Sequence, residues 1–220
     1  MKQKLYVILL FILSASFASA QIIITTPYEF AVGVSAGTTF SSVSFSPRVP
    51  QGNLMGATLG LTGRMTMGEY VGIQVELNYT QQGWKEEYEE WPELTYSRRI
   101  NYVQLPFYSH IQFGDKNVKG FINVGPQIGY MIGESTDDKL NGEEPGRENA
   151  QHVMPTEKKF EWGISGGAGI EIRTGIGYFL IEGRYLFSLG DIYNTTHADV
   201  FSKASGQTIT TKISYLIPLK

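Results

Sequence analysis

The chain has 220 residues, a formal net charge of −3 and no cysteine. The slightly acidic balance argues against nucleic acid as a partner, because such binding needs clustered lysine and arginine. The lack of cysteine excludes a disulfide framework and a thiolate metal site. The length suits one domain, and 25 glycines with 13% aromatic residues are typical of an all-β protein.

The first twenty residues have the features of a secretory signal peptide. Two lysines precede a short apolar run, and small residues then lead to an Ala-Ser-Ala ending. This pattern predicts cleavage between Ala20 and Gln21. The apolar run is roughly half the length that a membrane-spanning helix needs, and no comparable run follows it. We therefore predict a cleaved signal peptide over residues 1–20 and one domain over residues 21–220.

The remainder of the chain alternates apolar and polar residues in eight segments. In the clearest segment, residues 70–80, Val75 and Leu77 share one face while Gln74 and Glu76 share the other. Such alternation indicates a strand with one apolar and one polar face. The predicted strands cover residues 30–36, 57–67, 70–80, 100–113, 122–132, 160–173, 179–189 and 208–219.

Short and long connections between these segments alternate along the chain. The short connections are residues 67–70, 114–117 and 174–177, and the long ones are residues 38–53, 82–98, 133–159 and 190–206. Short turns at one end and long loops at the other are typical of outer-membrane barrels. The sequence therefore predicts an all-β fold, an eight-stranded antiparallel up-and-down transmembrane β-barrel, with its short turns in the periplasm.

The apolar faces are predicted to meet lipid, and the polar faces to line the lumen. Because backbone groups in lipid must pair within the protein, a spanning sheet closes on itself. A soluble barrel such as a lipocalin has the reverse arrangement, but these polar faces carry too many charges for an apolar cup. The charges are Arg64, Glu76, Glu161, Glu171, Arg173, Glu182, Arg184 and Lys212. Aromatic residues near the strand ends are expected to form the interfacial girdles, namely Tyr70, Tyr79, Phe107, Phe113, Trp162, Tyr178 and Phe187.

Four of the inward charges are expected at a similar, central height. They are Glu76, Glu182, Arg184 and Lys212. Eight strands enclose a lumen that side chains can fill, so these groups can meet across it. Two acids and two bases at one level neutralise each other, whereas an unpaired buried charge costs several kcal/mol. The hypothesis is a plug that opposes conduction, unless inward glycines such as Gly33 and Gly169 leave a continuous gap.

No set of residues predicts a catalytic, cofactor-binding or metal site. His110 is predicted to face the lumen, whereas His152 and His197 lie in separate long loops. An enzyme that uses histidine, aspartate and serine at the barrel rim is an alternative, but these histidines have no fixed spacing. We therefore expect a non-enzymatic protein without a cofactor.

Two of the long loops are acidic. The acidic residues are Glu86, Glu87, Glu89, Glu90 and Glu93, which surround Tyr88, Trp91 and Pro92, and further along the chain Asp137, Asp138, Glu143, Glu144 and Glu148. A solvated face explains these charges. Divalent cations that bridge to lipopolysaccharide, or a docking surface for a protein, are the alternatives. The expected partners are therefore outer-membrane lipid, lipopolysaccharide and envelope proteins.

Five motifs are spread between residues 75 and 185. They are Val75-Glu76-Leu77-Asn78-Tyr79 through Gln81-Gln82-Gly83, Tyr102-Val103-Gln104-Leu105-Pro106, Gly125-Pro126-Gln127-Ile128-Gly129-Tyr130, Gly166-Gly167-Ala168-Gly169-Ile170-Glu171 and Glu182-Gly183-Arg184-Tyr185. Their order and spacing resemble the PorT-like outer-membrane β-barrel proteins of the Bacteroidetes. The resemblance implies an eight-stranded outer-membrane barrel, and the member that names the family looks like part of a protein secretion machine.

A shared fold does not transfer that role. The predicted function is therefore a structural or interaction component of the cell envelope. The alternatives are an accessory component of a secretion or surface-assembly complex and, with less support, a narrow pore.

Overall fold

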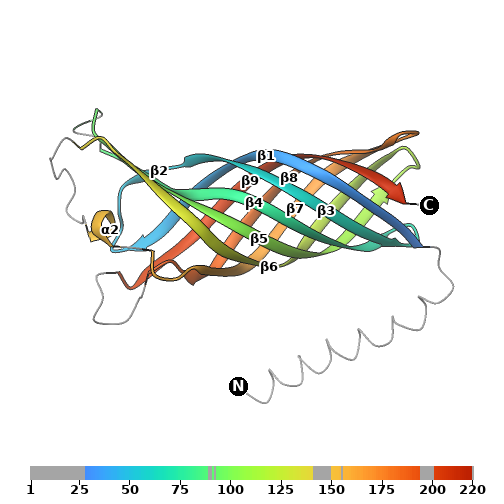
Figure 1. The fold of residues 1–220 in the computed structure, drawn as a ribbon. Coiled ribbons are helices and arrows are strands. Elements are labelled where there is room, and N and C mark those ends of the chain that lie inside the picture. The colour runs from blue at the N-terminus through green and yellow to red at the C-terminus, as the bar shows by residue number, and fades with distance from the viewer. Residues whose placement is uncertain are drawn as a thin grey trace, which may run out of the picture.

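One closed antiparallel sheet makes up nearly all of the described structure (Figure 1). The computed structural model describes residues 28–88, 91, 93–140, 150–154, 156–193 and 201–219. The predicted signal peptide and its cleavage point between Ala20 and Gln21 lie outside these residues. The elements are β1 (Tyr28–Ser46), β2 (Gln51–Gly52), β3 (Leu54–Met67), β4 (Val71–Glu87), β5 (Thr95–Gly114), β6 (Val118–Asp138), α2 (Ala150–Val153), β7 (Phe160–Thr174), β8 (Gly177–Asp191) and β9 (Lys203–Leu219).

The eight long strands form a ring. Their order is β4-β3-β1-β9-β8-β7-β6-β5, and pairing between β4 and β5 closes the sheet, while the two-residue β2 adds to β4. Each long strand is antiparallel to its neighbours. The predicted eight-stranded up-and-down barrel is thus confirmed. In the described residues, none of the helical structure is long and apolar enough to cross a bilayer.

The short connections gather at one end of the barrel, where β1 begins and β9 ends (Figure 1). They are residues 68–70, 115–117 and 175–176. Gly68 turns the chain with a φ of 67°, a left-handed conformation that glycine adopts without steric cost. The longer connections and α2 lie at the other end, which we call the outer end.

The strands extend further toward the outer end than the sequence predicted. β1 runs to Ser46, β4 to Glu87, and β5 begins at Thr95, so much of the expected loops 38–53 and 82–98 is strand. The reason is that the apolar side chains change from the outer face to the inner face, since Trp84 and other large apolar residues point inward there. A prediction that placed every apolar residue outside ends such a strand too early.

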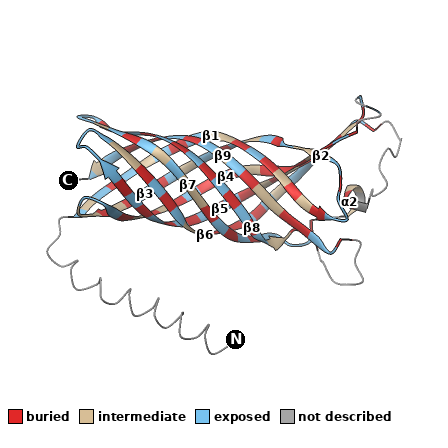
Figure 2. Ribbon diagram, turned by 180° about the vertical axis from the view of Figure 1, so that it is seen from behind, coloured by how far each residue is buried: buried red, intermediate tan, exposed pale blue. Residues whose placement is uncertain are grey.

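Buried and exposed residues alternate along each strand (Figure 2). In the middle of β4, Glu76 is buried inside while Leu77 is 48% exposed outside, as a lipid-facing barrel wall requires. The predicted girdle residues are exposed with one exception, because Tyr178 is 8% exposed and points inward. Its strand neighbour Phe179 takes the outward position, and alternation then turns Tyr178 to the lumen.

Candidate functional site

The four predicted central charges meet in the middle of the lumen. Arg184 on β8 donates to both oxygens of Glu76 on β4, at 2.9 and 3.0 Å. It also donates to both oxygens of Glu182, at 2.7 and 3.2 Å. Lys212 on β9 lies opposite Glu182 in register, yet its ammonium donates to Glu76 at 2.7 Å. All four residues are buried, and Glu76 accepts from both cations.

Neutral side chains complete the hydrogen bonding of this central charge cluster. Gln74 and Asn78 donate to the two oxygens of Glu76, at 2.6 and 2.9 Å, and Asn123 donates to Glu182 at 2.9 Å. The Arg184 guanidinium lies 4.5 Å from the ring centre of Tyr108. The sequence argument missed these residues, since alternation marks them as inward but does not say which charge each one meets.

A second charge layer lies nearer the short turns. Arg64 donates to Glu171, and Arg173 donates to Glu171 at 2.6 Å and to Glu29 at 3.3 Å. Three of these residues belong to the predicted inward set, whereas Glu29 was not singled out. Ion pairs therefore cross the lumen at two heights.

Little space is left between these layers and the outer end. Glu161 accepts from Ser188 at 2.7 Å and from Gln104 at 2.8 Å. Two cavities in this region have volumes of about 20 and 10 Å³, and a cavity of that size holds at most about one water. The inward glycines do not widen the lumen, because a Cβ on Gly33 or Gly169 would lie 2.0 or 2.3 Å from a backbone oxygen of the next strand. They permit close approach of the strands instead.

Above this level the lumen becomes apolar. We call the segments there the outer extension, residues 42–46, 82–88, 93–101, 133–140, 150–154, 190–193 and 201–206. Its buried apolar side chains, together with Val49, Tyr102 and Met131, form one apolar cluster that we call the outer chamber: Val43, Phe45, Trp84, Tyr88, Leu94, Tyr96, Ile100, Leu140, Ile192, Tyr193, Phe201 and Ala204. Aromatic rings pack against each other, with Phe45 and Trp84 at a centroid distance of 5.3 Å. The outward residues are polar, such as Ser44, Lys85 and Ser97.

The prediction that Glu86 belongs to an acidic loop surface is wrong. Glu86 is 1% exposed and points into the outer chamber. It accepts from Trp84 at 3.0 Å, from Tyr88 at 2.8 Å, and from Gln151 and His152 of α2 at 3.1 and 2.8 Å. The two-residue period of β4 continues to this point, so Glu86 lies on the same inward face as Gln82 and Trp84. Glu86 thus ties α2 to the barrel.

A second tie crosses the outer chamber. Arg98 pairs with Glu134 at 3.0 Å, and it donates to the Gln151 carbonyl at 3.1 Å and to the Tyr193 hydroxyl at 3.1 Å. Burial raises the pKa of Tyr193 to about 12, so its hydroxyl stays protonated at neutral pH. These contacts fix the connection that carries α2 across the outer end of the barrel.

The two histidines that the structure describes do not form a common site. His110 is buried in the lumen with its Nδ1 2.8 Å from Asn123 Oδ1, while His152 contacts Glu86 at the outer end. His197 lies outside the described residues. Within the part of the chain that the structure describes, no three acidic or histidine side chains are grouped as a metal site would require.

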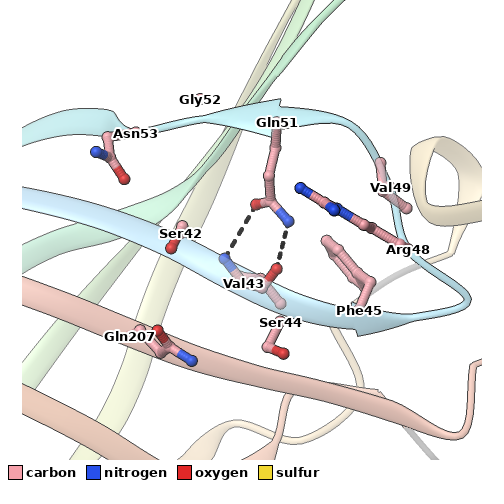
Figure 3. Close-up of a pocket in the computed structure, with 10 residues that line it drawn as sticks. All are labelled: Ser42, Val43, Ser44, Phe45, Arg48, Val49, Gln51, Gly52, Asn53 and Gln207. Carbon is pink, nitrogen blue, oxygen red and sulfur yellow. Dashed lines mark hydrogen bonds between the residues drawn. The ribbon is translucent and has the colours of Figure 1, made fainter.

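The largest hollow that we describe opens on the outer wall beside β1. It has a volume of about 410 Å³. Figure 3 shows Gln51 of β2 reaching across the hollow to the backbone of Val43 on β1. Arg48 and Asn53 line its rim. The sequence argument did not find this site, because it depends on where two strands separate.

The sequence matches the family described as outer membrane protein beta-barrel domain over residues 19–194. The chain belongs to this family. Membership supports a location in the bacterial outer membrane, in agreement with the lipid-facing wall. The narrower PorT-like assignment stays a prediction. No curated protein sequence matches the chain.

Solved outer-membrane barrels resemble the structure. OprG from Pseudomonas aeruginosa has a TM-score of 0.52 at 11% identity, covering 87% of this chain and 97% of that one. Neisserial surface protein A has a TM-score of 0.44 at 12% identity, covering 84% and 97%. At such low identity the likeness to OprG shows the fold alone.

One structure in this group corrects the expectation of a non-enzymatic protein. The outer membrane enzyme PagL has a TM-score of 0.43 at 13% identity, covering 84% of this chain and 99% of that one. The prediction that the protein is not an enzyme is therefore wrong as an exclusion, because barrels of this kind include an enzyme. The physical reason is that a barrel wall leaves its loops and rim free to carry different sites.

Proposed function

We propose that the protein is a structural and interaction component of the bacterial outer membrane. In this role the barrel anchors a rigid outer extension at the cell surface. The observation that carries the proposal is the contrast between a lumen crossed by ion pairs at Glu76 and an outer extension with its own apolar chamber. A packed, polar-surfaced extension suits the presentation of a binding surface, whereas a charge-filled lumen does not suit transport.

The proposed partners are lipid, lipopolysaccharide and envelope proteins. Exposed apolar residues around the barrel wall support lipid contact. At the outer end, Trp91 is 44% exposed, and Glu87, Glu93 and Asp137 are exposed as well. An exposed tryptophan among carboxylates supports a protein contact, since aromatic residues are enriched at the centres of interfaces. Carboxylates there also suit divalent cations that bridge to lipopolysaccharide phosphates. Glu89, Glu90, Pro92, Glu143, Glu144 and Glu148 lie outside the described residues.

A second candidate is an accessory role in a protein secretion or surface-assembly complex. The PorT-like motifs, such as residues 125–130 and 166–171, favour it. A narrow pore has less support, because conduction would require the Arg184 and Lys212 ion pairs with Glu76 to open.

Affinity purification from membranes and conductance recordings together separate an interaction role from a pore. The tagged full-length protein is extracted in mild detergent, and co-purifying proteins are quantified. A surface or machine component is expected to retain partners in fixed ratio, and the same yield from a barrel lacking residues 89–93 would argue against the acidic face. Planar-bilayer recordings with the purified protein are expected to show no steps of conductance. Steady single-channel openings would contradict the proposal and favour a pore.

A further inference from the structure

The outer end of β1 has an edge without a backbone partner. β1 pairs with β3 only as far as Ser41, opposite Leu54, and β2 pairs with β4 instead of β1. Pro47 and Pro50 lack an N–H group, so the connection between β1 and β2 cannot continue the ladder. Residues 42–46 therefore pair with β9 on one side and face the hollow on the other.

A side-chain amide stands in for the missing strand. Gln51 Oε1 accepts from the Val43 N–H at 3.1 Å, and Gln51 Nε2 donates to the Val43 carbonyl (Figure 3). Successive residues of an antiparallel strand direct their backbone groups to opposite sides, so the N–H and C=O of Phe45 point to the same edge as those of Val43. Among the described residues no hydrogen bond uses these two groups. One pair of edge groups is thus held by a displaceable side chain, and the next pair is open.

The hollow supplies two kinds of surface along this edge. Val43, Phe45 and Val49 line it with buried apolar side chains, while Arg48 is exposed at the rim. Among the described residues Arg48 forms no ion pair. Because side chains of directly paired residues point to the same face of a sheet, a strand added here would turn its alternate residues toward Val43 and Phe45.

We propose that this hollow binds an extended acidic segment of a partner protein, which adds to the β1 edge as a strand. The segment displaces the Gln51 amide and bonds to the backbone of Val43 and Phe45. It carries small apolar residues at alternate positions, which face the apolar floor, and a carboxylate between them, which pairs with Arg48. Backbone bonds give such a complex its affinity and the alternating side chains give its specificity. The inference rests on the proposed interaction role and names its site.

Peptide binding to the full-length protein in nanodiscs tests the proposal. The probe is a short synthetic peptide that alternates valine with glutamate and threonine, and its affinity is measured by fluorescence anisotropy. We expect saturable binding that Gln51→Ala strengthens by about tenfold, because that variant removes the two internal hydrogen bonds with which the peptide competes. We expect Arg48→Glu to weaken binding by about tenfold and to reverse its salt dependence, because salt then screens a repulsion between like charges.

Two controls separate strand addition from attraction between charges. One control is the same peptide with methyl groups on the backbone nitrogens that would face β1. It keeps its charge but loses the N–H donors to the β1 edge, and it should not bind. Lys159→Glu reverses an exposed cation on another part of the outer end, and it should leave the affinity unchanged. Equal binding of the methylated and unmodified peptides, or a Gln51→Ala variant with unchanged affinity, would overturn the proposal.

An anionic oligosaccharide is the competing ligand chemistry and is measured in parallel. If it binds in an Arg48-dependent manner while the peptide does not, the hollow is a saccharide site and the strand proposal is wrong. If membrane partners are recovered but neither the peptide nor Gln51→Ala has an effect, the interaction role stands and this edge is not its site. If the peptide binds as expected but no partner is recovered, the site stands and the proposed role fails.

Discussion

We call the strand segments below the outer extension the membrane belt. The membrane belt and the outer extension are built from the same strands, but the belt has its apolar side chains outside and the outer extension has them inside. In the belt, Leu77 faces outward and Glu76 inward, whereas seven to eight residues further along β4 Lys85 faces outward and Trp84 inward. The even-numbered residues of β4 are buried throughout this stretch, and of the odd-numbered ones only Gly83 is buried as well. What changes is the solvent outside the wall, since lipid favours an apolar surface and water a polar one. A barrel can therefore bury polar groups at one height and apolar groups at another without changing its backbone.

The largest expected effect breaks the polar half of this comparison. Glu76→Gln leaves Lys212 without its carboxylate and Arg184 with one acid instead of two. Loss of one partner from a buried charge cluster should destabilise the barrel by roughly 3–5 kcal/mol. The measurement is urea unfolding in phospholipid bilayers.

A double-mutant cycle shows whether the charges act as a unit. Glu76→Gln combined with Lys212→Met should lose less stability than the two single changes together, because the pair is removed as a whole. Glu182→Ala combined with Lys212→Ala should couple less strongly, since Lys212 donates to Glu76. Silent single variants and an additive double variant would mean that water solvates each charge separately.

The second prediction places the same charge on the outer surface of each region. Ile181 on β8 is 62% exposed and lies next to Glu182 at the central height. Ile181→Arg should destabilise the barrel by about 2–4 kcal/mol, as expected for arginine facing the middle of a bilayer. Ser97→Arg on the outer extension should change stability by less than about 0.5 kcal/mol. Similar losses at both positions would show that lipid also covers the outer extension.

The third prediction compares the removal of one methyl group in the outer chamber with the same removal on the lipid-facing wall. Ile100 is 2% exposed in the outer chamber, whereas Ile181 faces outward. Ile100→Val should lower the free energy of unfolding by about 1 kcal/mol, because the void stays inside a packed cluster. Ile181→Val should cost less, because lipid chains fill the space. Hydrogen exchange of the β4 and β5 amides near residue 100 will show whether the outer extension loosens by itself.

A small effect is also expected for an exposed ion pair on the outer extension. Lys85 and Glu87 are 3.0 Å apart, with side chains 38% and 58% exposed. Lys85→Ala should change the unfolding free energy by no more than about 1 kcal/mol, because water screens such pairs. A loss as large as that of Glu76→Gln would mean that this pair is buried against a partner.

The candidate sites were predictable to different degrees. The charges Glu76, Glu182, Arg184 and Lys212 could be selected because each stands on the polar phase of its strand. Which of them bond depended on side-chain reach across the lumen, and Lys212 reaches past its register partner Glu182 to Glu76. Glu86 was assigned to a solvated loop because local composition there is acidic, although the strand period turns it inward.

The sequence by itself determined the barrel. Two-residue alternation in eight segments, with short and long connections in turn, specifies an up-and-down sheet, and the need to pair every backbone group in lipid closes it. Only the tertiary structure decided where the strands end and what fills them. The outer chamber joins Phe45, Trp84, Tyr193 and Phe201, which are far apart in the chain. The β1 edge at residues 42–46 lacks a partner strand because β2 pairs with β4 rather than β1. Both features depend on contacts between distant segments, which local patterns do not encode.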